Sequence, residues 1–480
     1  MTFNERYFQS KEFQELLRNY ESSTASGGSL FLDVDDLVDI ADYYNYIGEG
    51  DKALELVEQG LELYPNDVLL NVFMARKALL DSDYEQAKHF ADTIDDKESP
   101  DYHYLVAEIM IAQGHTEEAD EYLRPLFVKT PADEVREFVK DVGNLFLDYA
   151  VFDKAYEWMM RIGDDNTDDF KELMGRALIG VGRYQEAEQL FNELLDRYPY
   201  SQAYWAALAS AQYMSEDFES AITSSEFALA IDPKHLASLS YKANSLMKLG
   251  NDEEALRFFK RFEDISPDDP SNLLNMGGCL MNLRRYEEAL DKLQKGLDNI
   301  DETIEEDREA ILPIFQEMVF CHCLNHHTDK ALELLDQASE RHCNPLDLLI
   351  LRGHVHLQRG ELEEAQNVYV QAIELANADP SIYLRIATSL YDNRYVQASY
   401  MLLKKFMKYD EQSLTEGYSY MALFCWDLKL WNEFAIYLHK AMKFNKKEDI
   451  RLVLSCLVPE ELPVEEYETY LLEQIKNMKH

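Results

Sequence analysis

The sequence is poor in the residues that interrupt helices and in the apolar runs that cross membranes. Its 480 residues include only 18 glycines and 13 prolines, and Ala, Leu, Glu and Tyr dominate. No apolar stretch approaches the ~18 residues needed to span a bilayer, and the first residues lack the basic and apolar segments of a signal peptide. We therefore expect a helical, cytoplasmic protein that has no membrane as partner.

Positive charge is also in short supply. There are 91 acidic against 46 basic residues, a formal net charge of −45, and residues 1–200 hold 44 acidic and 18 basic side chains. A field of this sign repels phosphate backbones, so we expect no nucleic acid as partner, whereas a basic partner would be attracted. The simpler interpretation is a charged coat that keeps an elongated protein in solution.

Sequence motifs for catalysis are missing. The chain contains no GxGxxG, P-loop, GxSxG or HExxH motif, and adjacent carboxylates are too frequent to indicate a site. The six cysteines all lie in the second half, where they fit reduced thiols better than a disulfide framework. We expect a protein that is not an enzyme and has no cofactor.

One cluster of side chains could hold a metal ion: Cys321, His322, Cys323, His326, His327, His342, Cys343, His354 and His356. Two of the histidines, His322 and His326, are four residues apart and could share a helix face, as metal ligands do. The spacing matches no recognised zinc pattern, so we favour packed histidines, buried thiols and no metal. A metal-dependent enzyme that uses the cluster at 321–356 is the remote alternative.

A short phrase containing alanine recurs at a regular interval. The alanines are Ala53, Ala87, Ala119, Ala155, Ala187, Ala221, Ala255, Ala289, Ala331, Ala365, Ala398 and Ala435. Five of the eleven spacings are 34 residues, and only the one between Ala289 and Ala331, which is 42, departs from 34 by more than three. A fixed period of this length is typical of a helical repeat array.

Other residues keep fixed offsets from these alanines. A small residue lies twelve positions earlier in nine repeats: Ala41, Ala75, Ala107, Gly143, Gly175, Ala209, Ala243, Gly277 and Gly353. Five positions earlier there is often a glycine, a proline often follows twelve positions later, and Trp205 is an aromatic residue early in its repeat. With these marks the sequence resembles the tetratricopeptide repeat (TPR) family over roughly residues 34–447.

The resemblance implies an all-α, right-handed superhelical solenoid of about twelve antiparallel helix-turn-helix repeats. Glycine permits the turn, small residues let paired helices approach closely, and stacked hairpins share one continuous core. We expect an N-terminal amphipathic helix and flexible linker over 1–33, the repeat array over 34–447, and C-terminal capping helices over 448–480. An acidic insertion near 298–308 interrupts the period and is expected to lengthen a helix or loop.

In this family the first helix of each repeat lines a concave groove. Carried onto this chain, the groove would present Tyr213, Met214, Asn244, Met247, Leu274, Asn275, Met281 and Phe320. Methionine adapts to irregular partners, and asparagine can hold an extended backbone. The alternative is that several of these side chains belong to the core between repeats. The groove would turn acidic toward the start, at Asp35, Asp39 and Asp42.

A subclass of the family clamps a terminal carboxylate with basic and Asn side chains on three successive repeats. Lys140 and Asn144 match one repeat, but Leu173, Ala203 and Ala206 replace the other clamp residues. The prediction is therefore a non-catalytic scaffold or adaptor, a monomer or weak homo-oligomer, that binds a protein or peptide segment in the groove. An assembly chaperone or regulatory subunit of a larger complex with a basic client is the alternative.

Overall fold

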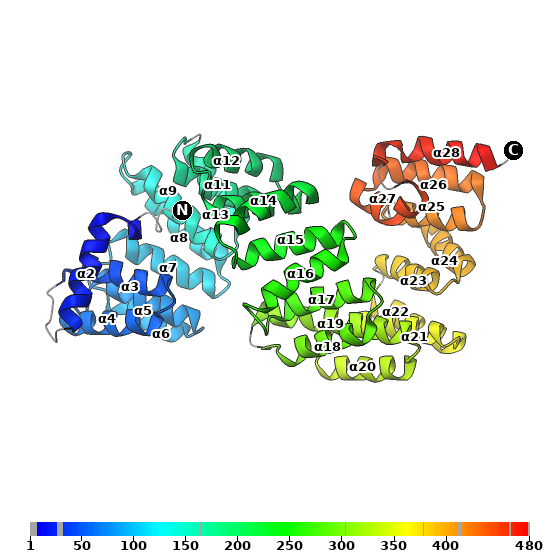
Figure 1. Cartoon of the computed structure of the whole chain (residues 1–480), viewed down its shortest axis with the longest axis horizontal. Coiled ribbons are helices and arrows are strands. Elements are labelled where there is room, and N and C mark those ends of the chain that lie inside the picture. Colours follow the sequence, from blue (N-terminus) through cyan, green and yellow to red (C-terminus); the bar gives the residue numbers. More distant parts are fainter. Residues whose placement is uncertain are drawn as a thin grey trace. The chain divides into compact units, whose positions relative to one another are not determined.

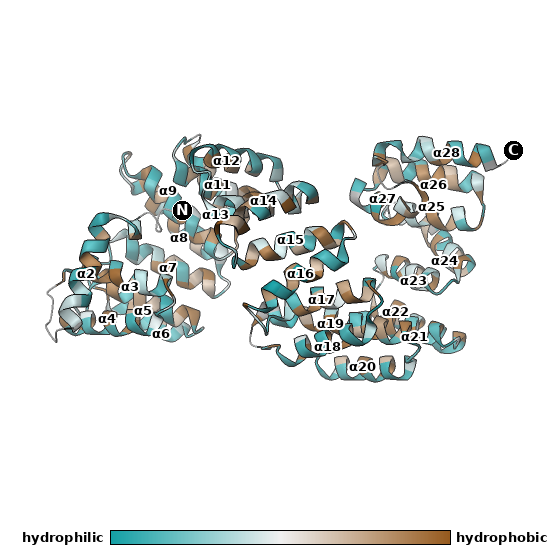
Figure 2. Ribbon diagram, viewed as in Figure 1, coloured by the Kyte–Doolittle hydropathy of each residue, from teal (hydrophilic) through white to brown (hydrophobic). Residues whose placement is uncertain are grey.

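The computed structural model describes residues 7–25, 32–163, 165–302, 304–377, 379–409, 415–459 and 462–478. Within these ranges there are 27 α-helices and no β-strand, which confirms the predicted all-α class (Figure 1). The chain divides into two compact units, unit 1 (Met1–Ile265) and unit 2 (Ser266–His480). Most helices carry both hydrophilic and hydrophobic residues, as helices with one buried face do (Figure 2).

Unit 1 contains fifteen of these helices. They are α2 (Lys11–Ala25), α3 (Val34–Tyr46), α4 (Gly50–Leu63), α5 (Val68–Leu80), α6 (Tyr84–Thr93), α7 (Pro100–Ala112), α8 (Thr116–Lys129), α9 (Val135–Asp148), α10 (Phe152–Met159), α11 (Asp168–Gly180), α12 (Tyr184–Arg197), α13 (Gln202–Met214), α14 (Phe218–Ile231), α15 (Leu236–Lys248) and α16 (Asp252–Glu263).

Unit 2 contains the other twelve. They are α17 (Pro270–Asn282), α18 (Tyr286–Asp298), α19 (Glu305–Leu324), α20 (Thr328–Glu340), α21 (Pro345–Gln358), α22 (Leu362–Leu375), α23 (Ser381–Asp392), α24 (Val396–Tyr409), α25 (Gly417–Asp427), α26 (Trp431–Phe444), α27 (Lys447–Leu454) and α28 (Tyr467–Met478).

The helices form twelve hairpins, seven in unit 1 and five in unit 2, which confirms the predicted number of repeats. Each odd-numbered helix from α3 to α25, here called a first helix, packs against the even-numbered second helix that follows it. Within each unit, every first helix also contacts the first helix of the next hairpin. The first helices of one unit therefore line up side by side, and one face of each stays outside the hairpin core.

Every hairpin turns through one residue with a positive φ. Glycine occupies this position in five hairpins, with φ between 75° and 80°: Gly48, Gly114, Gly182, Gly250 and Gly360. The other seven use Ser82, Ala150, Glu216, Arg284, His326, Arg394 and Lys429, with φ between 55° and 68°. The left-handed conformation is therefore a property of the turn, and glycine only lowers its steric cost.

The recurring alanine lies near the start of each second helix and is almost wholly buried. Ala53, Ala87, Ala119, Ala155, Ala187, Ala221, Ala255, Ala289, Ala331 and Ala365 are at most 1% exposed. The small residue of the first helix is buried in the same contact; Ala209 and Ala243, for example, are inaccessible. A side chain of this size lets the two helices of a hairpin approach closely, as predicted.

The last two repeats correct the predicted register. Ala398 is exposed, and the buried side chain at its position is Ser399, which is inaccessible. In the final hairpin the corresponding residue is Phe434, one position before Ala435. The prediction used the residue type alanine to mark the position, whereas the fold requires only a side chain that fits the contact.

The corrected register restores the other marks of the repeat. The left-handed residues Arg394 and Lys429 lie five positions before Ser399 and Phe434, as in every other hairpin. Twelve positions before Ser399 and Phe434 are Ala387 and Ala422, both inaccessible small residues of first helices. These two alanines complete a pattern that seemed to stop at Gly353.

Glycine is required in some first helices because a large side chain of the second helix occupies the space. A β-carbon on Gly353 would lie 2.2 Å from Cε1 of Tyr369, and one on Gly175 would lie 2.8 Å from the ring of Phe191. A β-carbon on Gly277 would lie 2.5 Å from Cδ2 of Leu293. Small and large residues thus compensate each other across the hairpin contact.

The N-terminal helix α2 covers the first hairpin. Phe8, Phe13 and Leu17 are buried with Leu37 and Ile40 of α3 in one core cluster. The helix extends to Ala25, within the segment 1–33 expected to hold an amphipathic helix and a flexible linker; residues 26–31 lie outside the described residues. An apolar helix face packed at this position closes the open end of the array.

The C-terminal helices and the acidic insertion have simple structural roles. Helices α27 and α28 pack on the last hairpin, with Leu454 and Leu471 in the core that includes Phe434. The insertion is a connection after α18 followed by the first turn of α19, which at 20 residues is the longest described helix. Among the described residues, no helix is both long and apolar enough to cross a bilayer.

Candidate partner-binding groove

The eight predicted groove residues lie on four first helices and are divided between the two units. Tyr213, Met214, Asn244 and Met247 belong to α13 and α15 of unit 1, and Leu274, Asn275, Met281 and Phe320 belong to α17 and α19 of unit 2. None of the eight is buried, and Met214 is 47% exposed. Each group is therefore a surface of its own unit.

In unit 1 the predicted surface is aromatic and polar. The ring of Tyr213 lies 5.7 Å from that of Phe218 and 5.8 Å from that of Tyr241, measured between centroids. Nδ2 of Asn244 donates a hydrogen bond to Oγ of Ser240 at 3.0 Å. The tyrosine is therefore held by neighbouring rings, and the amide is oriented by its own helix.

In unit 2 two of the predicted residues are also part of the packing. Leu274 and Phe320 are half-buried against the core of unit 2. The ring of Phe320 meets the imidazole of His354 edge-on, with centroids 5.3 Å apart. The alternative interpretation, in which some of these side chains serve the core, thus holds in part for these two residues.

The structure also brings together a charged groove in unit 1 that sequence reasoning identified only at single positions. It consists of three adjoining hollows of about 1010, 400 and 480 Å³ along the first helices α3, α5, α7 and α9. The first two hollows share Arg76 and Asp101, and the last two share Tyr104 and Asp141. We call this surface the acidic groove; its central residues are Asp42, Arg76, Asp101, Tyr104, Glu108, Asp141, Asn144 and Asp148.

A simple positional signal could have found part of this groove. In the first five hairpins, the residue directly after the small residue of the first helix is polar or charged: Asp42, Arg76, Glu108, Asn144 and Arg176. Consecutive helix residues point about 100° apart, so a residue next to a buried one faces away from the hairpin contact. Nε of Arg76 donates to Oε2 of Glu108 at 2.9 Å.

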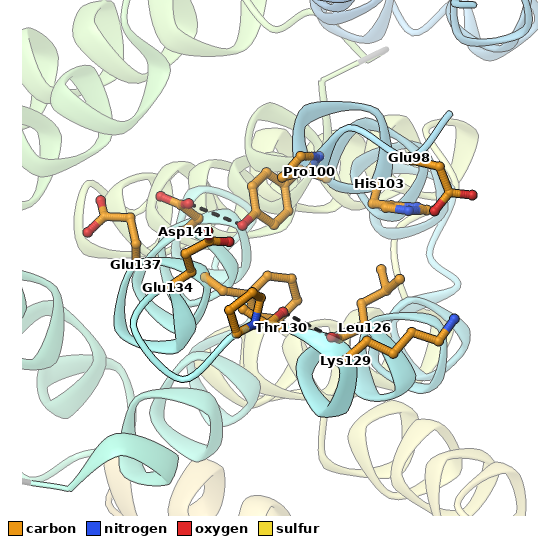
Figure 3. A pocket seen from close by; sticks show the side chains of 12 residues that line it. Glu98, Pro100, His103, Leu126, Lys129, Thr130, Glu134, Glu137 and Asp141 are labelled. Atoms are coloured by element: carbon orange, nitrogen blue, oxygen red, sulfur yellow. Dashed lines mark hydrogen bonds between the residues drawn. The ribbon is translucent and has the colours of Figure 1, made fainter. Parts of the chain in front are cut away.

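Tyrosine hydroxyls orient two carboxylates of the groove. The hydroxyl of Tyr104 donates to Oδ2 of Asp141 at 3.1 Å, and that of Tyr149 donates to Oε1 of Glu108 at 3.4 Å. Figure 3 shows the third hollow, with Asp141 on one side and Glu98, His103 and Lys129 on the other. The groove thus has a partly aromatic floor with carboxylates held on it.

Two of these carboxyl groups have raised pKa values. Asp42 and Asp141 are reachable by solvent, but the surrounding protein removes enough of their hydration to raise the pKa of each to about 6. The positive charge of Arg76 opposes the effect at Asp42, and the hydrogen bond from Tyr104 opposes it at Asp141. Loss of hydration therefore outweighs the stabilisation of the ionised form by the nearby cation or hydrogen bond at both carboxyl groups.

The partial carboxylate clamp is occupied by the chain itself. Nζ of Lys140 forms ion pairs with Asp169 and, at 2.7 Å, with Glu137. Nδ2 of Asn144 donates to Asp148 at 3.0 Å. Because carboxylates already surround this lysine, the structure offers no free cation here for the end of a partner chain.

Part of the histidine and cysteine cluster lies in the core of unit 2: Cys321, Cys323 and His354 are buried, whereas His326, His327 and His342 are exposed. Burial raises the pKa of the Cys321 and Cys323 thiols to about 11 each, and it lowers the pKa of His354 to about 4. Oγ of Ser389 and Nδ2 of Asn393 lie 3.3 and 3.0 Å from Nδ1 of His354. Among the described residues, no three His, Cys, Asp or Glu side chains are grouped so that they could hold a metal ion.

Family models match three separate segments of the chain. Residues 169–211 match a tetratricopeptide repeat model, residues 353–393 match a TPR repeat model, and residues 214–296 match the model described as anaphase-promoting complex, cyclosome, subunit 3. The matched segments lie in both units and within the repeat array.

Similar known proteins match over part of their length. The chain is 29% identical over 148 residues to Protein FlbA of Caulobacter vibrioides, covering 30% of this chain and 25% of that protein. It is 26% identical over 140 residues to the Saccharomyces cerevisiae small glutamine-rich tetratricopeptide repeat-containing protein 2, covering 29% and 38%. The chain thus spans about a quarter to two fifths of the length of these relatives.

Solved structures that match most of the chain have low sequence identity and low TM-scores. The match to the crystal structure of yeast Tom70 covers 92% of this chain and 98% of the Tom70 chain, with 15% identity and a TM-score of 0.43. The anaphase-promoting complex hetero-tetramer Cut9-Hcn1 covers 98% and 95%, with 12% identity and a TM-score of 0.35.

Proposed function

Since this chain belongs to the tetratricopeptide repeat proteins, we propose that it is a non-catalytic scaffold that binds a segment of a partner protein on its first helices. The observation that carries the proposal is the side-by-side arrangement of first helices within each unit, with outward side chains that the hairpin cores do not use. Such a row of helices offers repeated pockets to an extended or helical segment.

The surface of unit 1 supports this role. In unit 1, Tyr213, Met214, Asn244 and Met247 combine aromatic, adaptable and hydrogen-bonding side chains on neighbouring first helices. The outer surface of the second helices carries mainly charged side chains of the kind that keep a protein in solution, such as Glu58 and Asp92.

The proposal can be tested by photo-crosslinking in cells that express the protein naturally. A photoreactive phenylalanine at position 244 or 275 tests the first-helix surface of each unit. The same residue at position 223 or 291, on the second helices α14 and α18, is the matched control, since Thr223 and Asp291 are exposed. We expect discrete protein crosslinks from 244 or 275 and few from 223 and 291. Crosslinks that arise chiefly from the second helices would contradict the proposal.

A further inference from the structure

The acidic groove is continuous, because neighbouring hollows share wall residues. Asp101 and Arg76 belong to both the first and the second hollow, and Asp141 and Tyr104 belong to both the second and the third. One bound segment could therefore contact all four first helices from α3 to α9. Because the groove extends across several repeats, it suits an elongated ligand better than a small molecule.

Negative charge exceeds positive charge along the whole groove. Ten carboxylate side chains and four cationic side chains line the three hollows. Three of the four cations already have partners: Lys52 pairs with Glu49, Arg76 with Glu108 at 2.9 Å, and Lys77 with Asp81 at 2.5 Å. The negative excess is therefore directed at something outside the chain.

The carboxylates are spread out rather than gathered at one point. No group of three of them among the described residues is close enough to hold a metal ion, so a single compact cation would meet only part of the charge. A chain of cationic side chains a few residues apart could meet the carboxylates of successive repeats. The ring of Tyr104, which lines the second and third hollows, could pack against the aliphatic stems of such side chains.

We propose that the occupant of the acidic groove is a segment of a partner protein rich in lysine and arginine. The inference rests on the proposed scaffold function and names the chemistry of the partner that unit 1 binds. Opposite charges would speed the encounter and select against acidic segments.

The pKa of Asp42 gives this interaction a pH dependence. Asp42 faces Arg76 from α5 and Asp39 from its own helix. A cation bound beside it stabilises the ionised carboxylate, so binding lowers the pKa from about 6 and releases a proton near that pH. Affinity should therefore rise as the pH increases through 6.

The same holds for Asp141 at the other end of the groove. It faces Tyr104 and Asp101 from α7, and Glu137 and Lys140 from its own helix. Its pKa, also about 6, should fall when a cation binds. The two ends of the groove thus respond to pH in the same direction.

The test uses the full chain and two synthetic peptides of 16 residues. One peptide carries lysine and arginine at alternate positions, and the other carries glutamate at the same positions. Fluorescence anisotropy at pH 7.5 and pH 5.5, at low and physiological salt, gives the dissociation constants. We expect binding of the basic peptide only, with weaker affinity at pH 5.5 and at higher salt.

A charge-matched pair of variants separates the groove from general attraction to an acidic protein. The groove variant is Asp42→Asn with Asp141→Asn, and the control is Glu58→Gln with Asp92→Asn on the second helices, all four residues being exposed. We expect the groove variant to weaken binding about tenfold or more and to lose the pH dependence, and the control to change it less than about threefold. Thermal melts establish that both variants fold.

Three results would overturn the inference. They are equal losses in the two variants, equal binding of the acidic peptide, and self-association in sedimentation experiments that the groove variant abolishes, which would make the occupant a second copy. Photo-crosslinks from first helices without selective binding of the basic peptide would refute this inference but leave the proposed function standing. Crosslinks chiefly from second helices would refute both.

Discussion

The first helices of the two units use the same framework but present different side chains. In the first five hairpins of unit 1, the residue after the small one is Asp42, Arg76, Glu108, Asn144 or Arg176. In the five hairpins of unit 2 it is Gly278, Phe320, His354, Thr388 or Leu423, none of which carries an ordinary charge at neutral pH. His354 and Leu423 are even buried. The two units thus share the packing of the hairpins but differ in charge at the position after the small residue.

The difference follows from helix geometry. The small residue must face the second helix, because a large side chain there would push the hairpin apart. Its neighbour points about 100° away and escapes that constraint. The hairpin contact therefore limits the size of the small residue more strictly than that of the residue after it, so that the two positions can vary separately.

The largest expected effect tests whether the framework is the same in both units. Ala221→Leu in unit 1 and Ser399→Leu in unit 2 place a large side chain at an inaccessible position. Each should lower the free energy of unfolding by about 1–3 kcal/mol through overpacking, measured by chemical denaturation of the full chain. Ala398→Leu is the control and should change it by less than about 0.5 kcal/mol because Ala398 is exposed. A larger loss from Ala398→Leu than from Ser399→Leu would restore the register read from the sequence.

A smaller effect separates the small residue of a first helix from the residue directly after it. Gly277→Ala in α17 places a β-carbon 2.5 Å from Cδ2 of the buried Leu293, whereas a β-carbon on Gly278 meets nothing within 4 Å. Gly277→Ala should lower the melting temperature, by an amount equivalent to about 1–2 kcal/mol. Gly278→Ala should raise the melting temperature, by an amount equivalent to up to about 1 kcal/mol, because alanine favours helix. If both substitutions stabilise the protein, the close contact in this hairpin does not exist.

The smallest expected effect, per pH unit, is the difference between the two units in how the free energy of unfolding depends on pH. His354 in unit 2 has a folded pKa of about 4, so between pH 6.5 and 4 the unfolded chain binds more protons and stability falls as pH falls. Asp141 in unit 1 has a folded pKa of about 6, so between pH 6 and its model value of 3.8 the folded chain binds more protons and stability rises as pH falls. Each slope is less than about 1.4 kcal/mol per pH unit.

Two variants isolate these slopes. The stability of His354→Gln minus that of the parent should increase as the pH falls from 6.5 to 4.5. The same difference for Asp141→Asn should decrease over that range. Denaturant titrations of the full chain at four pH values give both curves, and curves of the same sign would show that one of the two environments is wrongly assigned.

Much of the fold could be predicted because the hairpin contact restricts residue size at every repeat. Ala53 and Ala289, for example, mark the same buried position 236 residues apart. The prediction slipped at Ala398 because an exposed alanine looks the same in the sequence as a buried one. The neighbouring serine fits the contact equally well, as its burial shows.

The predicted groove was harder to assess from sequence. Phe320 and Leu274 contact both the surface and the core, a distinction that depends on which neighbours surround them. Arg76 and Asp141 were not singled out, because single charged residues are common on a protein with a net charge of −45. Only stacking of α5, α7 and α9 brings them to one wall.

The sequence by itself determined the helical class, the number of hairpins and the places where the chain turns, because these depend on side-chain size and backbone freedom at short range. Tertiary structure decided which small residue enters each contact, which end helices close the array, and which charges share a groove. These features depend on residues some 30 positions apart meeting across repeats, as Arg76 and Glu108 do. The repeat position indicates that both side chains face away from the hairpin contact, but only the stacking of the hairpins brings the two together.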